Sequence, residues 1–272
     1  MRTSQLGPLL AFALLFSATA IQAQQSSTSV PSVQSTWTFR RDTVATALLQ
    51  KSVAAMAATA PSDSAATGSL TIVEGSTNET GTITIQTHGM AETAETIDLP
   101  DGHRAVIYNN GDAKEVNGSN SVIPTLQLIL VDQCVDFPLP LLSAFVNNPD
   151  ESIHYVGQES LNGVSVQHIQ VWNSFASKPR MQKLGLAPFS VREIWLDATS
   201  YLPVKVAYSR RMGGGAYPSI PVAITFSNYK NVNGVLYPFQ IDKSYNGTPW
   251  QTITIQSVSF NTGLTDAQFE TE

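Results

Sequence analysis

The residues that could coordinate a metal ion are few and widely spaced. The chain contains four histidines, His88, His103, His154 and His168, and one cysteine, Cys134. Helical metal motifs need two ligands about four positions apart, and zinc sites need clusters of Cys and His; neither pattern occurs. His154 and His168 could meet across one hairpin, which gives two ligands at best. We therefore expect neither a metal nor a cofactor.

Residues for nucleophilic or phosphate chemistry are equally hard to find. No Gly-x-Ser-x-Gly turn occurs, and serine is too common in this chain for any one to stand out. The glycine run after Met212 is not followed by a helical pattern, so a flexible hairpin loop explains it better than a phosphate loop does. Cys134 lies in an apolar stretch, where a buried, unreactive thiol is the simpler interpretation.

Two acidic pairs, Asp132/Asp136 and Asp150/Glu151, could in principle supply general acid and base. The first pair would share a helix face, but solvation of a helix end explains it more simply. Without any sign of burial, neither pair predicts glycoside chemistry. We predict that the protein is not an enzyme, and a hydrolase is the least favoured of three functional classes.

The clearest structural pattern lies between Val222 and Phe269. Apolar residues recur at every second position, and Asn233-Gly234 and Asn246-Gly247 separate the apolar runs. This alternation is typical of strands with one covered face, and Asn-Gly pairs favour tight hairpin turns. The stretch predicts an antiparallel meander of at least three strands.

Composition indicates an exported protein. Only 13% of the 272 residues are charged, 42% are hydrophobic, and the formal net charge is −6. A mildly acidic chain has no electrostatic reason to bind nucleic acid, whose binding proteins carry basic patches. Residues 1–23 have the features of a cleaved signal peptide: Arg2, an apolar run from Leu9 to Phe16, and small residues up to Ala23.

The apolar run of this signal is far shorter than the ~20 residues needed to span a bilayer, and no later segment is long enough. No cysteine lies near the cleavage site, so we expect a mature protein without a lipid anchor. Residues 24–35 are rich in Ser, Thr and Gln and predict a flexible tether. We expect residues 36–272 to form a single domain.

The rest of the chain alternates between helical and strand patterns. A helix is expected from Asp42 or Thr43 to about Ala58, with Val44, Leu48, Leu49, Val53 and Met56 on one apolar face. Strand patterns follow from Gly68 and again from Ser152, so that we expect about ten or eleven strands in total. Between them, residues 123–148 form an unusually apolar insert with two short helical stretches, the first over 125–134 and the second starting at Pro140.

A sheet of this size that does not close leaves a concave face, and an apolar concave face can bind apolar ligands. The alternative is a solid core packed against the helices, and the sequence favours neither over the other. The candidate lining residues are Ile83, Ile85, Val106, Tyr108, Leu126, Leu130, Leu141, Phe145, Ile194, Leu196, Val204, Val206, Ile224, Phe226, Phe239, Ile253 and Ile255.

The order of elements and several short motifs resemble the outer-membrane lipoprotein-sorting superfamily, the LolA/LolB-like periplasmic carriers. The motifs are Glu193-Ile-Trp-Leu-Asp197, Leu202-Pro203, the segment from Asn228 to Pro238, and the segment from Asn261 to Phe269. The resemblance implies a mainly β (α+β) fold: an antiparallel unclosed half-barrel with an N-terminal helix and a helical plug. It also implies a periplasmic location and an apolar cavity that holds acyl chains. In these carriers a basic residue on the barrel helps to hold the helical lid, a role that Arg104 or Arg40 would take here.

We therefore expect a monomeric carrier of lipid or acylated lipoprotein cargo, with possible inner- or outer-membrane partner proteins. The alternative is a binding or sensor module of the same fold that recognises a protein or lipid signal without transport. The loop of residues 173–190 is long for this superfamily and carries Lys178, Arg180 and Lys183 without any acidic residue. These three cations would contact anionic headgroups or a membrane partner, unless the loop is simply solvated.

Overall fold

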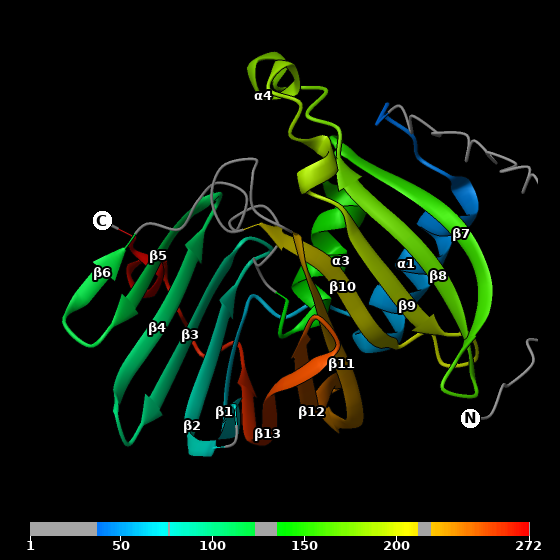
Figure 1. Ribbon diagram of the computed structural model, residues 1–272. Helices are drawn as coiled ribbons and strands as arrows, with labels where there is room; N and C mark the ends of the chain where they lie inside the picture. The colour runs from blue at the N-terminus through cyan, green and yellow to red at the C-terminus, as the bar shows by residue number, and fades with distance from the viewer. Residues whose placement is uncertain (1–36, 76, 123–134, 212–218, 272) are drawn as a thin grey trace, which may run out of the picture. The chain divides into compact units, whose positions relative to one another are not determined.

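The computed structural model describes residues 37–271 except 76, 123–134 and 212–218, and this part of the chain holds one antiparallel sheet of thirteen strands (Figure 1). The predicted signal peptide, the tether and the first insert helix (125–134, with Cys134) lie outside the described residues. The strands are, in chain order, β1 (Asp63–Glu74), β2 (Thr77–His88), β3 (Glu92–Leu99), β4 (Gly102–Asn109), β5 (Asp112–Asn117), β6 (Asn120–Val122), β7 (Glu151–Leu161), β8 (Val164–Asn173), β9 (Arg192–Asp197), β10 (Pro203–Arg211), β11 (Ser219–Val232), β12 (Val235–Tyr245) and β13 (Thr248–Phe260).

The sheet runs in the order β6-β5-β4-β3-β2-β1-β13-β12-β11-β10-β9-β8-β7, so β6 and β7 are its edges and the described strands do not close into a barrel. This confirms the predicted fold class of a mainly β, unclosed half-barrel. The strand count exceeds the expected ten or eleven partly because β5 and β6 are short additions, six and three residues long, at one edge. The C-terminal meander is β11, β12 and β13, with Asn233 and Asn246 at positive φ in its turns, as predicted.

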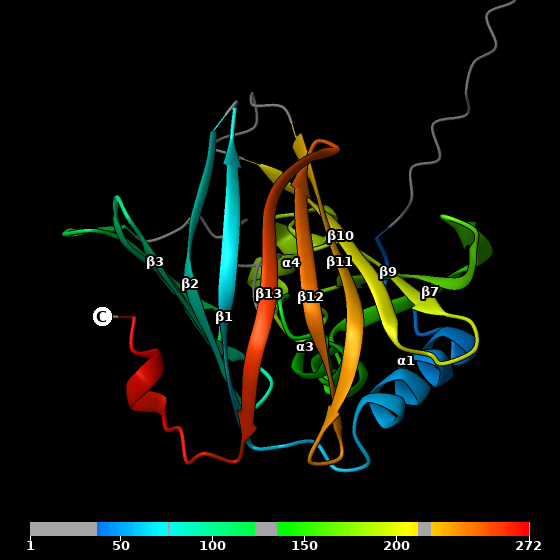
Figure 2. The same ribbon diagram turned by 90° about the horizontal axis from the view of Figure 1, so that it is seen from below.

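The inner face of the sheet is apolar because alternate residues of each strand point the same way. Ile169, Ile194, Val206 and Ile224 are direct register neighbours on β8, β9, β10 and β11, and each is 0% exposed. Figure 2 shows the sheet as an arch, with α3 (Pro138–Asn147) on its concave side and the C-terminal turn η2 (Asp266–Phe269) outside it. Burial on this face provides the main driving force for folding.

One glycine allows two strands to approach closely where the register of β1 against β13 shifts. A Cβ atom on Gly68 would lie 2.4 Å from the carbonyl oxygen of Thr254, so any other residue would push the strands apart. Irregularities of this kind bend a strand and increase its twist, which helps a sheet to curve.

Helix α1 (Thr43–Met56) begins as predicted, with the Asp42 carboxylate accepting hydrogen bonds from the backbone N–H groups of Val44 and Ala45. Its buried face differs at one point from the predicted stripe. Val44 is 53% exposed, whereas Ala45 is fully buried. The face centres on Ala45, Leu49, Ser52 and Met56, spaced at helical intervals, which turns Val44 in the first turn towards solvent.

The remaining helical segments are short: α3 (Pro138–Asn147), α4 (Pro179–Lys183), the 3₁₀ turn η1 (Ala187–Phe189) and the 3₁₀ turn η2 (Asp266–Phe269). Helix α3 is the predicted second insert helix and starts at Pro138 rather than Pro140; both prolines fall in its first turn, where their missing N–H groups cost nothing. Figure 1 shows α4 projecting beyond the ends of β8 and β9.

The C-terminal segment is tied back to the start of β1 through one carboxylate. Asp63 accepts hydrogen bonds from the Thr262 N–H at 2.6 Å, the Thr262 hydroxyl at 2.7 Å and the Gly263 N–H at 3.1 Å. Burial alone raises the pKa of Asp63, but the hydrogen bonds from Thr262, Gly263 and Ser62 outweigh it and lower the pKa below its usual value. The carboxylate therefore stabilises the fold as long as it is ionised.

We expect Asp63→Ala to lower the free energy of unfolding by about 1–3 kcal/mol, because charge-assisted hydrogen bonds are lost. The effect should disappear as the pH falls below about 4, because a lowered pKa gives stability that is lost when the folded-state carboxylate is protonated. Urea unfolding at several pH values tests this. Asp98→Ala, which removes an exposed carboxylate paired with His103, is the control and should cost less than about 0.5 kcal/mol. Equal effects of the two variants would contradict the assignment.

Candidate binding site

Helix α3 fills the concave side of the sheet and is referred to below as the plug (Figure 2). Most of its side chains are buried, among them Leu139, Leu141, Leu142 and Phe145. Just before it, the Phe137 ring stacks on the Tyr237 ring of β12 with centroids 4.4 Å apart. The plug therefore supplies the apolar surface that the open half-barrel lacks.

A basic residue holds the C-terminal end of the plug. The Arg41 guanidinium donates to the carbonyl oxygens of Val146 at 2.7 Å and Asn148 at 2.9 Å. A cation at the C-terminus of a helix satisfies carbonyls that have no intrahelical partner. Of the residues expected to hold the lid, Arg104 hydrogen-bonds Asp101 at the hairpin tip, and the Arg40 side chain is largely exposed beside Asp42. The predicted lid helix (125–134) lies outside the described residues, so their role there stays a prediction.

A buried ion cluster holds the other end of the plug. The Lys243 ammonium, on the inner face of β12, lies 2.7 Å from the Asp136 carboxylate just before the plug and 2.9 Å from the Glu95 carboxylate of β3. The three side chains are 8%, 6% and 16% exposed, respectively. Because β3 and β12 are separated in the sheet by β2, β1 and β13, the Lys243–Glu95 pair bridges the inside of the arch.

The cluster holds more negative than positive charge when all three groups are ionised. Burial and then the charge of Glu95 raise the pKa of Asp136 to about 7, despite the opposing effect of Lys243. For Lys243, burial alone would lower the pKa, but the two carboxylates outweigh burial and raise it. Lys243 therefore stays charged at neutral pH, and Asp136 is the group that gains or loses a proton.

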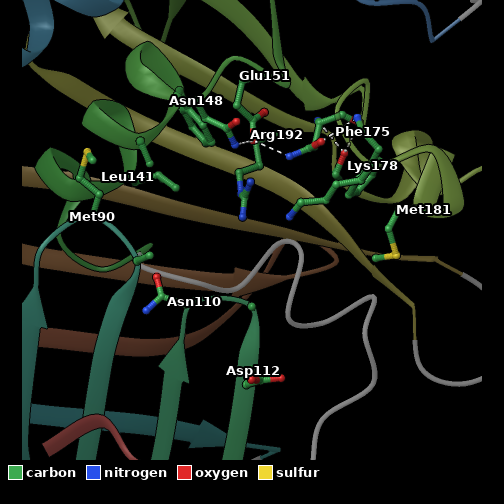
Figure 3. Close-up of a pocket in the computed structure, with 16 residues that line it drawn as sticks. Met90, Asn110, Asp112, Leu141, Asn148, Glu151, Phe175, Lys178, Met181 and Arg192 are labelled. Carbon is green, nitrogen blue, oxygen red and sulfur yellow. Dashed lines mark hydrogen bonds between the residues drawn. The ribbon is translucent and has the colours of Figure 1, made fainter. Parts of the chain in front are cut away.

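One cavity, named the mouth cavity, has a volume of about 420 Å³ and lies across the open side of the half-barrel (Figure 3). This volume falls within the range of about 300–1,000 Å³ that is typical of small-molecule sites. The lining residues come from two hairpin tips on one wall, from the plug, and from β7 to β9 with the α4 loop on the other wall. They are Met90, Ala91, Asn110, Gly111, Asp112, Leu141, Ala144, Phe145, Asn148, Glu151, Asn173, Phe175, Lys178, Met181, Ser190 and Arg192.

The mouth cavity is apolar on the plug side, and its walls carry the cations Arg192 and Lys178 together with the acidic residues Glu151 and Asp112. Figure 3 shows the Arg192 and Lys178 side chains pointing into the same space, which Asn110 and Asp112 face from the other side. Arg192 is 6% exposed, and its guanidinium carbon lies 5.3 Å from the centroid of the Phe145 ring. Burial raises the pKa of the nearby Glu151 carboxyl, and the positive charge of Arg192 opposes this rise.

Two smaller cavities lie on either side of the plug. The first, about 260 Å³, is mainly apolar and lies between α1, the β2–β3 turn and the plug, with Val53, Met90, Phe137 and Leu139 in its lining. The second, named the inner cavity, is about 100 Å³ and contains the ion cluster. Its other lining residues are Thr93, Val106, Tyr108, Glu115, Val135, Tyr208, Arg210, Val222, Tyr245 and Trp250.

The predicted lining residues divide between these cavities and the packed core. Leu141 and Phe145 line the mouth cavity, and Val106 and Tyr108 line the inner cavity. Leu126 and Leu130 lie outside the described residues. Val204 is partly buried on β10 and lines none of these three cavities. The other predicted residues also line none of them and belong to the packed core: Ile83, Ile85, Ile194, Leu196, Val206, Ile224, Phe226, Phe239, Ile253 and Ile255.

The predicted basic loop is exposed, and only one of its three cations reaches a cavity. Lys178 lines the mouth cavity, whereas Arg180 and Lys183 lie on the exposed helix α4. The body of the loop is fixed at its base, where the Ser177 N–H donates to the Asp150 carboxylate at 2.7 Å. The Asp150 carboxylate, one of the acidic pair considered above, thus holds the base of this loop.

The histidines occupy hairpins and the outer surface. His154 and His168 are not opposite each other: their register partners are Gln170 and Gly157. His168 hydrogen-bonds Glu193 at 2.8 Å and stacks on the Trp195 ring. Sequence reasoning missed one group of possible metal ligands, His88, Glu92 and Asp266, because η2 brings Asp266 to the β2–β3 hairpin only in the folded chain.

Sequence reasoning also missed Lys243, Glu95 and Arg192. Each occupies an inward position in a strand otherwise read as apolar on that face, and this interruption of the alternation was the available signal. Asp136 was noticed, but it was explained as a solvated helix end, whereas the structure buries it.

Comparison with solved structures places this geometry among known proteins. A domain from Vibrio parahaemolyticus described as an outer membrane lipoprotein-sorting protein superposes with a TM-score of 0.60 at 14% identity, covering 84% of this chain and 96% of that one. A LolA superfamily protein from Nitrosomonas europaea gives a TM-score of 0.56 at 11% identity, covering 83% and 97%. The chain has the LolA-superfamily fold.

A DUF1329 family protein from Desulfovibrio piger shares this LolA-like fold, with a TM-score of 0.54 at 13% identity over 83% of this chain and 97% of that one. No protein-family model and no curated protein sequence matches the chain. The fold expected from the resemblance is thus confirmed. In the part of the chain that the structure describes, no helix is both long and apolar enough to cross a bilayer.

The ion cluster predicts an unusual pH dependence for Asp136→Asn. Because the pKa of Asp136 is raised to about 7, the folded chain keeps a proton that the unfolded chain releases above about pH 4. The free energy of unfolding of the wild type should therefore fall relative to Asp136→Asn as the pH rises from about 4 to about 7. Urea unfolding at pH intervals measures this difference.

The same series on Asp242→Asn gives the background for this measurement, because Asp242 precedes Lys243 on β12 and faces the other side of the strand. If the wild type instead became more stable relative to Asp136→Asn as the pH rises over this range, Asp136 would be held as a carboxylate and the assignment would be contradicted.

Proposed function

We propose that the protein is a periplasmic carrier that binds acyl chains of a lipid or an acylated lipoprotein and catalyses no reaction. The observation that carries the proposal is the mouth cavity, which joins an apolar floor formed by the plug to the cations Arg192 and Lys178. A site of this composition is complementary to an amphiphile with an apolar chain and an anionic head.

The architecture supports the proposal because the apolar inner face is covered by separate, short elements. The plug is ten residues long and follows the predicted lid segment. If the plug moves away, the packed core residues Phe226, Ile253 and Ile255 become available to an acyl chain. Burying about ten methylene groups would contribute about 8 kcal/mol, from which the cost of association is subtracted.

The basic loop extends the proposal to the donor or acceptor of the cargo. Arg180 and Lys183 are exposed on α4, and Leu184 beside them is 61% exposed. Lys178 links this loop to the mouth cavity. We assign to the loop the contact with anionic headgroups or with a membrane partner, so that the cargo would enter and leave next to the docking surface.

Native mass spectrometry of the mature protein, purified from the periplasm and followed by organic extraction, tests the carrier function directly. We expect a discrete added mass that extracts as lipid, and rebinding of a long-chain fatty acid by delipidated protein. A clean unliganded mass that persists after incubation with phospholipid and acylated peptide would overturn the proposal. That result would favour a module of the same fold that recognises a protein or lipid signal without transport.

The mouth cavity also predicts different roles for two neighbouring lysines. Lys178→Gln should weaken the binding of an anionic amphiphile by about threefold to fivefold, because a partly solvated charge contributes less than about 1 kcal/mol. Lys183→Gln is the matched control, because Lys183 lies in the same loop but does not line the cavity. Fluorescence titration with a polyene fatty acid measures both. Equal loss in the two variants would assign the effect to the charge of the loop as a whole.

A further inference from the structure

Lys243 lies at a buried position, where the charge of a lysine is energetically unfavourable. Its register neighbours across the sheet are Ile224 on β11 and Gln251 on β13, and its own strand places Ile241 and Tyr245 on the same face. An ammonium buried on an apolar face requires compensating charges and hydrogen bonds. An apolar residue would pack here without any such partner, so the positive charge itself calls for an explanation.

The two carboxylates that compensate Lys243 belong to different parts of the molecule. Glu95 is fixed in the sheet on β3, whereas Asp136 precedes the plug and must move whenever the plug moves. Burial and then the charge of Glu95 raise the pKa of Asp136 to about 7, so Lys243 is bound less strongly to Asp136 than to a fully ionised carboxylate near neutral pH. Asp136 is therefore the replaceable partner.

The surroundings of Lys243 can accept a small anionic group. The inner cavity of about 100 Å³ corresponds to the space of roughly three water molecules at about 30 Å³ each, enough for a carboxylate or phosphate. The Gln251 amide nitrogen, on the residue paired with Lys243 across the sheet, and the Tyr237 hydroxyl of the same strand as Lys243 are buried without a hydrogen-bond partner among the described residues. Neither residue lines the inner cavity, but buried polar groups normally have partners, so both add hydrogen-bonding capacity near Lys243.

The charge balance also allows an exchange. The charged groups that line the inner cavity are Lys243 and Arg210 against Glu95, Glu115 and Asp136. If an external monoanion replaced the Asp136 carboxylate, the balance would stay the same. Val106, Tyr108 and Val222 in the same lining offer apolar surface to the chain attached to such a group.

We propose that the Lys243 ammonium is the anchor for the anionic headgroup, carboxylate or phosphate, of a single-chain acyl amphiphile. The Asp136 carboxylate holds that place while the plug is seated. The proposal rests on the proposed carrier function: Arg192 and Lys178 at the mouth cavity meet the incoming headgroup, and Lys243 in the inner cavity holds it in the final complex, in competition with the seated plug.

The test compares binding of oleate and oleyl alcohol, which share a chain and differ in charge, at about pH 8, where Asp136 is ionised. Calorimetric titration is carried out on wild type, Asp136→Asn, Lys205→Met and the triple variant Glu95→Gln/Asp136→Asn/Lys243→Met. The triple variant removes the whole cluster, so no unpaired buried charge remains. Lys205→Met is the matched control, because Lys205 lies on the outer face of β10 over the Trp195 ring.

We expect Asp136→Asn to bind oleate about threefold or more tightly than wild type and to bind oleyl alcohol unchanged. The triple variant should lose the preference for oleate, and Lys205→Met should behave as wild type. Circular dichroism checks that each variant is folded; if the triple variant is not, Asp136→Asn still decides. Acetate and inorganic phosphate at millimolar concentration should not displace oleate.

Each contrary result has a distinct meaning. Equal oleate affinity in wild type and Asp136→Asn would overturn the anchor while leaving the carrier function intact. Displacement of oleate by acetate or phosphate would show that Lys243 takes free anions rather than headgroups. Binding of neither oleate nor oleyl alcohol by the wild type would remove both this inference and the carrier function.

Discussion

A curved sheet that does not close must cover its concave face, because a large apolar surface is unstable in water. In this protein the inner positions of β8 to β11 form an unbroken apolar band, and nothing in the sheet itself covers it. The cover consists of α1 and the plug. These covering elements are separate from the sheet. The position of the cavities, the contacts of Arg41 and Lys243 that hold the plug, and the burial of charged groups all follow from this.

The two ends of the plug are held by interactions of different physical kinds. Arg41 donates to backbone carbonyls, an interaction that does not depend on protonation in the physiological range. Lys243 contacts the Asp136 carboxylate, whose pKa of about 7 makes this contact sensitive to pH. The plug is thus held at both ends, and only the contact before its N-terminal end involves a group with a pKa near neutrality.

The sequence was informative wherever local patterns determine structure. Alternating residues and Asn-Gly turns predicted the meander of β11 to β13, and Asp42 predicted the start of α1, because these features depend on neighbours only a few positions away. The insert was expected to lie against the sheet because of its apolar composition. The motifs after Gly157 led to the correct superfamily fold.

The sequence was much less informative about the site. Glu95 and Lys243 are 148 positions apart, and no local pattern predicts that strands at these positions face each other across an arch. The contact of Arg41 with the end of the plug was not predicted, because alternation along the extended chain decides which of the neighbouring residues Arg40 and Arg41 faces the plug. Local sequence also could not predict whether the concave face is a cavity or a packed core, because the space around an inward residue depends on where the plug lies.

The backbone around Arg41 has a further consequence. Next to the edge strand β7, the Asp42 N–H donates to the carbonyl of Ile153 and the Ile153 N–H donates to the carbonyl of Arg40, so that this short stretch pairs with the start of the edge as a parallel bridge. The opposite edge strand, β6, is only three residues long. Unpaired strand edges allow proteins to join edge to edge and aggregate. The segment that leads into α1 therefore also covers the start of this edge and limits edge-to-edge pairing there.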